Sequence, residues 1–307
     1  MQGVFEGFAT IGVVIALGAL LGHFGFLDLD AQMLLSRQSF FVASPALIVT
    51  VLDHADVAGV LSANLVATFA GFLAASVLYL VAARLVWRHD LGDTVIGMLS
   101  SSYVNAGNLG LPIAAYVLGD AALVAPTLLM QLLVLQPLAL AALDHASSSS
   151  AFSIGRALLQ PVTNPLTVGS IVGVLLAVTG LTLPGGVREP LQLVGDMAVP
   201  SMLLAYGVSL RLGPRAGHGT SLAEIGWIAV LKLVVQPATA YAVARFALGV
   251  GDAQLLAITV LAALPAAQNI FVHATRYGHA EVVARDSIFV TTLLAVPAIL
   301  VIAAVLA

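Results

Sequence analysis

Long apolar segments recur from one end of the chain to the other, and short connections between them hold most of the charges, glycines and prolines. A helix needs roughly 20 mostly apolar residues to cross a bilayer, and the segments reach that length. The pattern therefore predicts an all-α, polytopic membrane protein with ten spanning helices. They lie near residues 4–22, 31–52, 59–87, 93–119, 121–143, 162–180, 190–210, 221–248, 253–279 and 281–305.

The two halves of this pattern resemble each other. Three short matches occur in the same order and at a nearly constant separation: Thr10–Gly12 with Thr167–Gly169, Ser44–Leu47 with Val199–Met202, and Ala83–Leu85 with Ala244–Phe246. Five helices per half is an odd number, so the halves must cross the membrane in opposite directions. We predict a single domain over residues 1–307, built as an inverted repeat of the kind that secondary carriers use: repeat 1 near 4–143, a serine-rich linker near 144–160, and repeat 2 near 162–305.

Helices 4 and 9 each carry a polar, helix-breaking run at mid-segment, at Ser100–Ile113 and Ala263–Phe271. Proline lacks an amide hydrogen and glycine tolerates non-helical angles, so both segments should unwind there. Unwound backbone cannot face lipid, and must line a cavity or pack against protein. Half-helix N-termini favour an anion, freed carbonyls favour a cation, and amide side chains serve either. The predicted substrate-binding residues are Asn105, Gly107, Asn108, Gly110, Pro112, Pro265, Gln268 and Asn269.

Composition supports the membrane assignment and excludes several functions. Hydrophobic residues make up 60% of the chain and charged residues 8%, with a mean hydropathy of +1.07. There is no cysteine and no basic cluster, which argues against thiol chemistry and nucleic acid as a partner. We find no nucleophile with a nearby base and no His or carboxylate cluster spaced for a metal, so an enzyme is not expected.

The basic residues predict the orientation. If both termini lie outside, one set of arginines collects on the cytoplasmic side, as the positive-inside rule requires. Only Arg188 and Arg245 then fall outside, while Lys232 lies within helix 8. The cytoplasmic set is Arg37, Arg84, Arg88, Arg156, Arg211, Arg215, Arg276 and Arg285.

Three ionisable residues are candidates for ion coupling. Lys232 lies well inside helix 8, where it can complement an anion, change protonation state, or simply pair with a neighbour. His273 follows the helix 9 break by one turn and either shuttles a proton or packs. Asp196 near the start of helix 7 has either a coupling role or a structural contact.

Other polar and small residues have secondary roles in this interpretation. Gln136 and Gln236 each precede a proline, where their amides can bind carbonyls freed by a kink. Glycines with small-x-x-x-small spacing in helices 1 and 6 predict close helix packing or a homodimer face. They are Gly18, Gly22, Gly169 and Gly173.

Over almost its whole length the chain resembles the auxin efflux carrier family, which includes plant PIN-type carriers and short bacterial-type members within the wider superfamily of bile acid and sodium symporters. The most specific similarities are Asn105 with Gly110 and Pro112, and Leu264–Pro265 followed by Phe271–Val272 and Tyr277. The resemblance implies that helices 4 and 9 cross, that helices 1, 2, 6 and 7 form a scaffold, and that helices 3–5 and 8–10 form a transport domain moving as an elevator.

The resemblance also implies a substrate class. Asn105 is then the amide that contacts a substrate carboxylate, and Pro265 shapes the second broken helix. This chain has only a short central connection, and Gln268, Asn269 and His273 replace residues that are mostly apolar in plant members, which argues against auxin itself. Bacterial relatives are linked with small carboxylates, so a small organic anion is the expected substrate.

Together these observations predict a secondary transporter of a small organic anion in the cell membrane. No cofactor is expected, and the coupling ion is left open: Na⁺ held near Asn105, Asn108, Gln268 and Asn269, a proton, or none. Two alternatives are a membrane sensor or anchor that binds without transporting, and a sodium-coupled carrier like the bile acid symporters. Besides the substrate, the expected partners are the lipid bilayer and a second copy of the chain.

Overall fold

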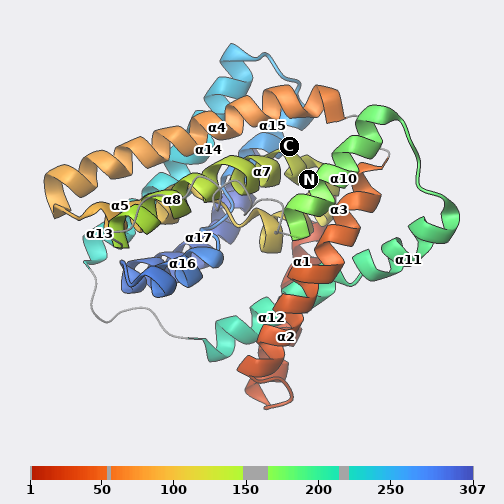
Figure 1. Ribbon diagram of the computed structural model, residues 1–307, viewed down its shortest axis with the longest axis horizontal. Helices are drawn as coiled ribbons and strands as arrows, with labels where there is room; N and C mark the ends of the chain where they lie inside the picture. Colours follow the sequence, from red (N-terminus) through yellow and green to blue (C-terminus); the bar gives the residue numbers. More distant parts are fainter. Residues whose placement is uncertain (1, 54–56, 148–164, 214–220, 307) are drawn as a thin grey trace. The chain divides into compact units, whose positions relative to one another are not determined.

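A computed structural model describes residues 2–53, 57–147, 165–213 and 221–306, and this part of the chain is helical almost throughout (Figure 1). Within these residues, one isolated β-bridge joins two non-helical segments. The all-helical fold class is therefore confirmed. Most of the predicted linker near 144–160 lies outside the described residues, as do Arg156 and Arg215.

Five helical stretches are long and apolar enough to cross a membrane: Leu29–Leu52, Ala63–Trp87, Gly185–Leu212, Leu222–Ala247 and Glu281–Leu306. Shorter apolar helices occupy Ile11–His23, Ala121–Met130 and Asp252–Ala262. Many large apolar side chains on these helices are exposed, among them Leu193, Phe246 and Val305, which suits contact with lipid tails. The chain is a multi-pass membrane protein, whereas ten spans arranged as an inverted repeat stay a prediction.

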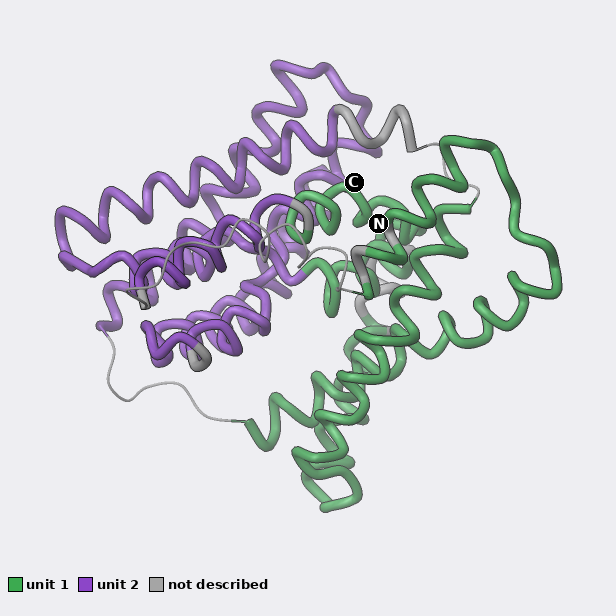
Figure 2. Tube along the Cα trace, viewed as in Figure 1, with its two compact units in different colours: residues 1–61, 106–132, 161–214 green, residues 62–105, 133–160, 215–307 purple. Residues whose placement is uncertain are grey.

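The chain divides into two compact units (Figure 2). Unit 1 comprises residues 1–61, 106–132 and 161–214. Its helices are α1 (Gln2–His23), α2 (Leu29–Gln38), η1 (Ser39–Ala43), α3 (Ser44–Leu52), η3 (Ala106–Gly110), α6 (Leu111–Tyr116), η4 (Ala121–Val124), α7 (Ala125–Met130), α10 (Pro165–Thr179), α11 (Gly185–Gly195) and α12 (Ala198–Leu212).

Glycines let the helices of unit 1 approach closely. A Cβ atom on Gly18 of α1 would overlap the Leu204 carbonyl of α12. On α10, a Cβ on Gly169 would lie 2.8 Å from the Pro45 carbonyl oxygen, and one on Gly173 would lie 2.8 Å from the Leu52 Cβ. The small-residue spacing thus serves packing within the unit, and a homodimer through these helices stays a prediction.

Unit 2 comprises residues 62–105, 133–160 and 215–307. It takes most of α4 (Val57–Ala82) and then η2 (Ala83–Trp87), α5 (Leu91–Ser102), α8 (Gln136–Ser147), α13 (Leu222–Val230), η6 (Leu231–Val235), α14 (Gln236–Ala242), η7 (Val243–Ala247), α15 (Asp252–Ala262), α16 (Asn269–Tyr277) and α17 (Glu281–Leu306). The segment η5 (Gln131–Leu135) begins in unit 1 and ends in unit 2.

Two apolar clusters hold α4 against the rest of unit 2. One joins it to α14, η7 and α15, with Ala67, Ala240 and Ile258 fully buried. The other joins it to α13, η6 and α17, with Ala75, Ile228 and Leu231 fully buried. These clusters fix the helices from which the polar residues of the candidate site project. The assignment of scaffold and transport helices is untested and stays a prediction.

Candidate functional site

Both predicted interruptions of helical structure are present. The helix α5 ends at Ser102, Tyr103 has extended backbone angles, and helical turns resume at Ala106. The second interruption separates the end of α15 at Ala262 from the start of α16 at Asn269. Pro112 lies in the first turn of α6, directly after the helical turns of η3, and not within the gap.

The two interruptions pair with each other inside unit 2. Val104 and Ala266 form an antiparallel β-bridge. The backbone N–H of Asn105 donates to the Pro265 carbonyl at 2.8 Å, and the backbone N–H of Ala267 donates to the Tyr103 carbonyl at 3.2 Å. The Ala266 amide donates to the Thr291 hydroxyl of α17 at 3.2 Å. Backbone groups that lack helical partners are therefore satisfied within the protein, as a membrane interior requires.

A small cavity lies beside this pairing. Its volume is about 10 Å³, room for about one water molecule. The Tyr103 hydroxyl donates to the Gln136 Oε1 atom at 3.3 Å. The Asn269 Oδ1 atom is buried without a hydrogen-bond partner among the described residues. The full lining is Leu99, Tyr103, Gln136, Ala139, Asn269, Ile270 and His273.

The predicted site residues fall into both units. Asn105, Pro265, Gln268 and Asn269 are brought together in unit 2, with Asn105 and Pro265 buried. The remaining four predicted residues belong to unit 1, in η3 and α6: Gly107, Asn108, Gly110 and Pro112. Among the coupling candidates, His273 lines the cavity, whereas Asp196 is an exposed residue between α11 and α12 in unit 1. A binding role for these residues stays a prediction.

Lys232 lies in η6 and is fully buried in unit 2. Its Nζ atom donates to the Gln236 Oε1 atom at 2.7 Å and to the Ser102 carbonyl at 3.1 Å. The Gln236 Nε2 atom donates to the same carbonyl at 2.9 Å. Gln236 therefore binds the carbonyl at the end of α5, and not one freed by its own proline. Both side chains stand out in the sequence, whereas the carbonyl that they share does not.

The chain is similar to known membrane transport proteins. A family model described as "Membrane transport protein" matches residues 4–143 and 142–303. The chain belongs to this family of membrane transport proteins. The resemblance to auxin efflux carriers is thereby confirmed, and the protein is a transporter and not an enzyme.

Two curated relatives are similar over most of their length. One, from Rhizobium meliloti, is named "Putative malonate transporter" and is 26% identical over 95% of this chain and 90% of its own. The other, from Methanothermobacter thermautotrophicus, is named "Uncharacterized transporter" and is 27% identical over 77% of this chain and 76% of its own.

Unit 2 also holds a buried carboxylate that the sequence pattern does not single out. Glu224, in the first turn of α13, is buried with only 3% of its surface exposed. Its Oε1 atom accepts from the Tyr79 hydroxyl at 2.6 Å and lies 2.9 Å from the His89 Nε2 atom. The available signal was a glutamate close to a long apolar run. Its partners come from α4 and the loop after η2, so no local pattern connects them.

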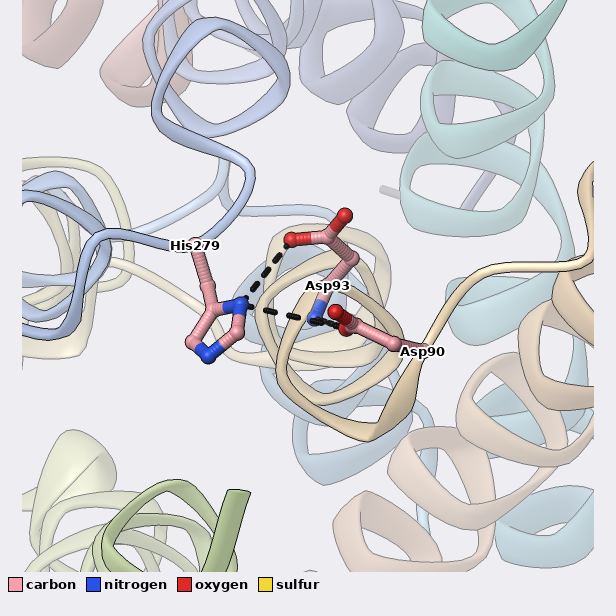
Figure 3. A group of neighbouring side chains, drawn as sticks. All are labelled: Asp90, Asp93 and His279. Atoms are coloured by element: carbon pink, nitrogen blue, oxygen red, sulfur yellow. Dashed lines mark hydrogen bonds and ion pairs between the residues drawn. The ribbon is translucent and has the colours of Figure 1, made fainter. Parts of the chain in front are cut away.

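Asp90, Asp93 and His279 also gather in unit 2 (Figure 3). The His279 Nδ1 atom lies 3.3 Å from Asp93 Oδ1 and 3.8 Å from Asp90 Oδ1. Spacing along the chain does not predict this cluster, because its residues meet from distant segments. Asp90 caps α5 by accepting from the Asp93 amide at 2.8 Å, so capping and ion pairing account for the cluster.

Proposed function

We propose that the protein is a secondary transporter of a small organic anion, with its substrate site at the paired interruptions. The observation that carries this proposal is the backbone pairing of residues 103–105 with 265–267 in buried surroundings. Interrupted helices inside a membrane protein are tolerated where they line a site, and this is how secondary carriers build theirs.

The polar groups beside the pairing suit a carboxylate. Asn105 and Asn269 carry amide groups that can donate to its oxygens, and α16 begins at Asn269, so its positive dipole end adds to the attraction. Lys232 places a basic group in the same unit. The Rhizobium meliloti relative has malonate in its name, which supports a small dicarboxylate as the first substrate to try.

The cavity is too small for such a substrate as it stands. A volume of about 10 Å³ holds about one water molecule, whereas a dicarboxylate has several heavy atoms. Binding therefore requires movement of the lining side chains or helices. We propose that this movement belongs to an alternating-access cycle of the elevator type, in line with the family resemblance.

Uptake by reconstituted proteoliposomes tests the proposal. A panel of labelled mono- and dicarboxylates, malonate included, is offered to wild type and to Asn105→Ala. We expect wild type to accumulate or exchange at least one anion faster than empty liposomes. The variant should be slower by about tenfold or more, because a charge-assisted hydrogen bond contributes roughly 1.5–3 kcal/mol.

A matched control separates site loss from general damage. Asn64 is another buried amide of unit 2, and its Oδ1 atom accepts from the Thr68 hydroxyl of the same helix at 3.0 Å. Asn64→Ala should keep transport close to wild type at matched thermal stability. Binding of an anion without any flux would support the sensor alternative instead. Equal transport by Asn105→Ala and wild type would refute the site assignment.

A further inference from the structure

The most unusual charged group in unit 2 is Lys232. Its side chain is fully buried, and both of its hydrogen bonds go to neutral oxygens, those of Ser102 and Gln236. In the part of the chain that the structure describes, no carboxylate lies within ion-pairing distance of its Nζ atom. A buried lysine normally has a carboxylate partner, whereas Lys232 has two neutral oxygens in its place.

These oxygens have the chemistry of a cation site. Ser102 is the last residue of α5, and its carbonyl lies at the C-terminal end of a half-helix, where the helix dipole is negative. In carriers with broken helices, such half-helix ends and unwound carbonyls coordinate Na⁺. Here Lys232 Nζ lies 2.7 Å from Gln236 Oε1 and 3.1 Å from the Ser102 carbonyl oxygen, so this nitrogen stands where a small cation would bind.

We propose that Lys232 is a resident cation that fills a cation site at the end of α5, so that the carrier works without Na⁺ at this position. For its consequence, a flux that needs no Na⁺ at the end of α5, the proposal rests on the proposed transport function. The binding chemistry itself does not depend on transport. The ligand class that the vacated site would take is a small monovalent cation, such as Na⁺, ammonium or methylammonium.

The surroundings hold the cation in place. Gln236 binds the Ser102 carbonyl through Nε2 while its Oε1 accepts from Lys232, so the amide orientation is fixed from both ends. The Ser76 hydroxyl donates to the Ser102 hydroxyl at 2.9 Å, which ties α4 to the same residue. Removing the lysine side chain should therefore leave a formed site and not a collapsed one.

Two substitutions of Lys232 separate a cation site from simple packing. Lys232→Ala removes the ammonium group and leaves room for a small cation, whereas Lys232→Met fills most of the volume with an uncharged chain. The apparent melting temperature of purified full-length protein is measured in choline, sodium, ammonium and methylammonium chloride. Methanol at the same concentration serves as an uncharged probe for the cavity.

We expect Lys232→Ala to melt lower than wild type in choline. A small cation at about ten times its dissociation constant should raise the melting temperature by roughly 2 to 4 °C. Methanol should not do so, and Lys232→Met and wild type should not respond to the cation. If Lys232→Ala is unfolded in choline, folded protein should be recovered in methylammonium.

Three results would overturn the proposal: equal responses of the Ala and Met variants, the same recovery with methanol, or no recovery in any cation. The failure of the transport proposal is distinguishable, because the melting experiment needs no flux. A wild type that moves no anion would refute the function while the cation response of Lys232→Ala still stands.

Discussion

The hydrogen bond from the Ala266 amide to the Thr291 hydroxyl offers a sharp test of how the second interruption is held. Ala266 and Thr291 are both fully buried, and the bond measures 3.2 Å. Thr291→Val keeps a β-branched side chain of similar shape and removes only the hydroxyl. The amide, which projects from a non-helical segment, then loses its partner in a place that water does not reach.

The expected cost follows from that loss. Leaving a buried donor unsatisfied costs about 1–3 kcal/mol, and for a chain of this size this lowers the melting temperature by roughly 2 to 10 °C. The assay is thermal unfolding in one detergent at one scan rate, because membrane protein melting is often irreversible. Transport should also slow, since the segment carrying Pro265 loses an anchor.

Thr292→Val is the matched control. Thr292 is the next residue of α17 and is also buried, at 7% exposure. Among the described residues, its hydroxyl makes no hydrogen bond to either helix interruption. The control should lose less stability than Thr291→Val. If the two variants have the same melting temperature, the hydroxyl of Thr291 does not hold the interruption and the reasoning is wrong.

Two further substitutions test the packing of α5 and the cavity. A Cβ atom on Gly97 would overlap the Tyr79 side chain, so Gly97→Ala should lower the melting temperature by several degrees. Gly226→Ala is the control: no atom lies within 4 Å of the added Cβ, so this variant should be neutral or slightly stabilising. Tyr103→Phe removes the hydroxyl that donates to Gln136. Initial uptake rates should show a KM for the anion raised by roughly 3- to 10-fold, with little change in melting temperature. An unchanged KM would exclude the hydroxyl from substrate binding.

The sequence pattern predicts the helical segments and both interruptions, because length, hydropathy, proline and glycine act locally. It also predicts that Asn105 and Pro265 share a site. It does not reveal that backbone atoms join them, nor that Thr291 supplies a third contact. These contacts link residues far apart in the chain, and their geometry depends on how α5, α15 and α17 pack.

The same limit explains the polar clusters. Lys232 stands out in an apolar helix, but its partner is a backbone carbonyl, which carries no signature in a sequence. Glu224 was missed because its partners Tyr79 and His89 come from another part of the chain. In the Asp90 cluster the helix-capping role is local and predictable, whereas the approach of His279 is not.

The bridge between the two interruptions is made of main-chain atoms, at Tyr103, Asn105, Pro265 and Ala267. Main-chain hydrogen bonds do not depend on which side chains those positions carry, provided that the backbone can adopt the same angles. A descendant protein can therefore exchange the amide at Asn105 or Asn269 for other groups and acquire a new cargo while the architecture that presents them is inherited unchanged.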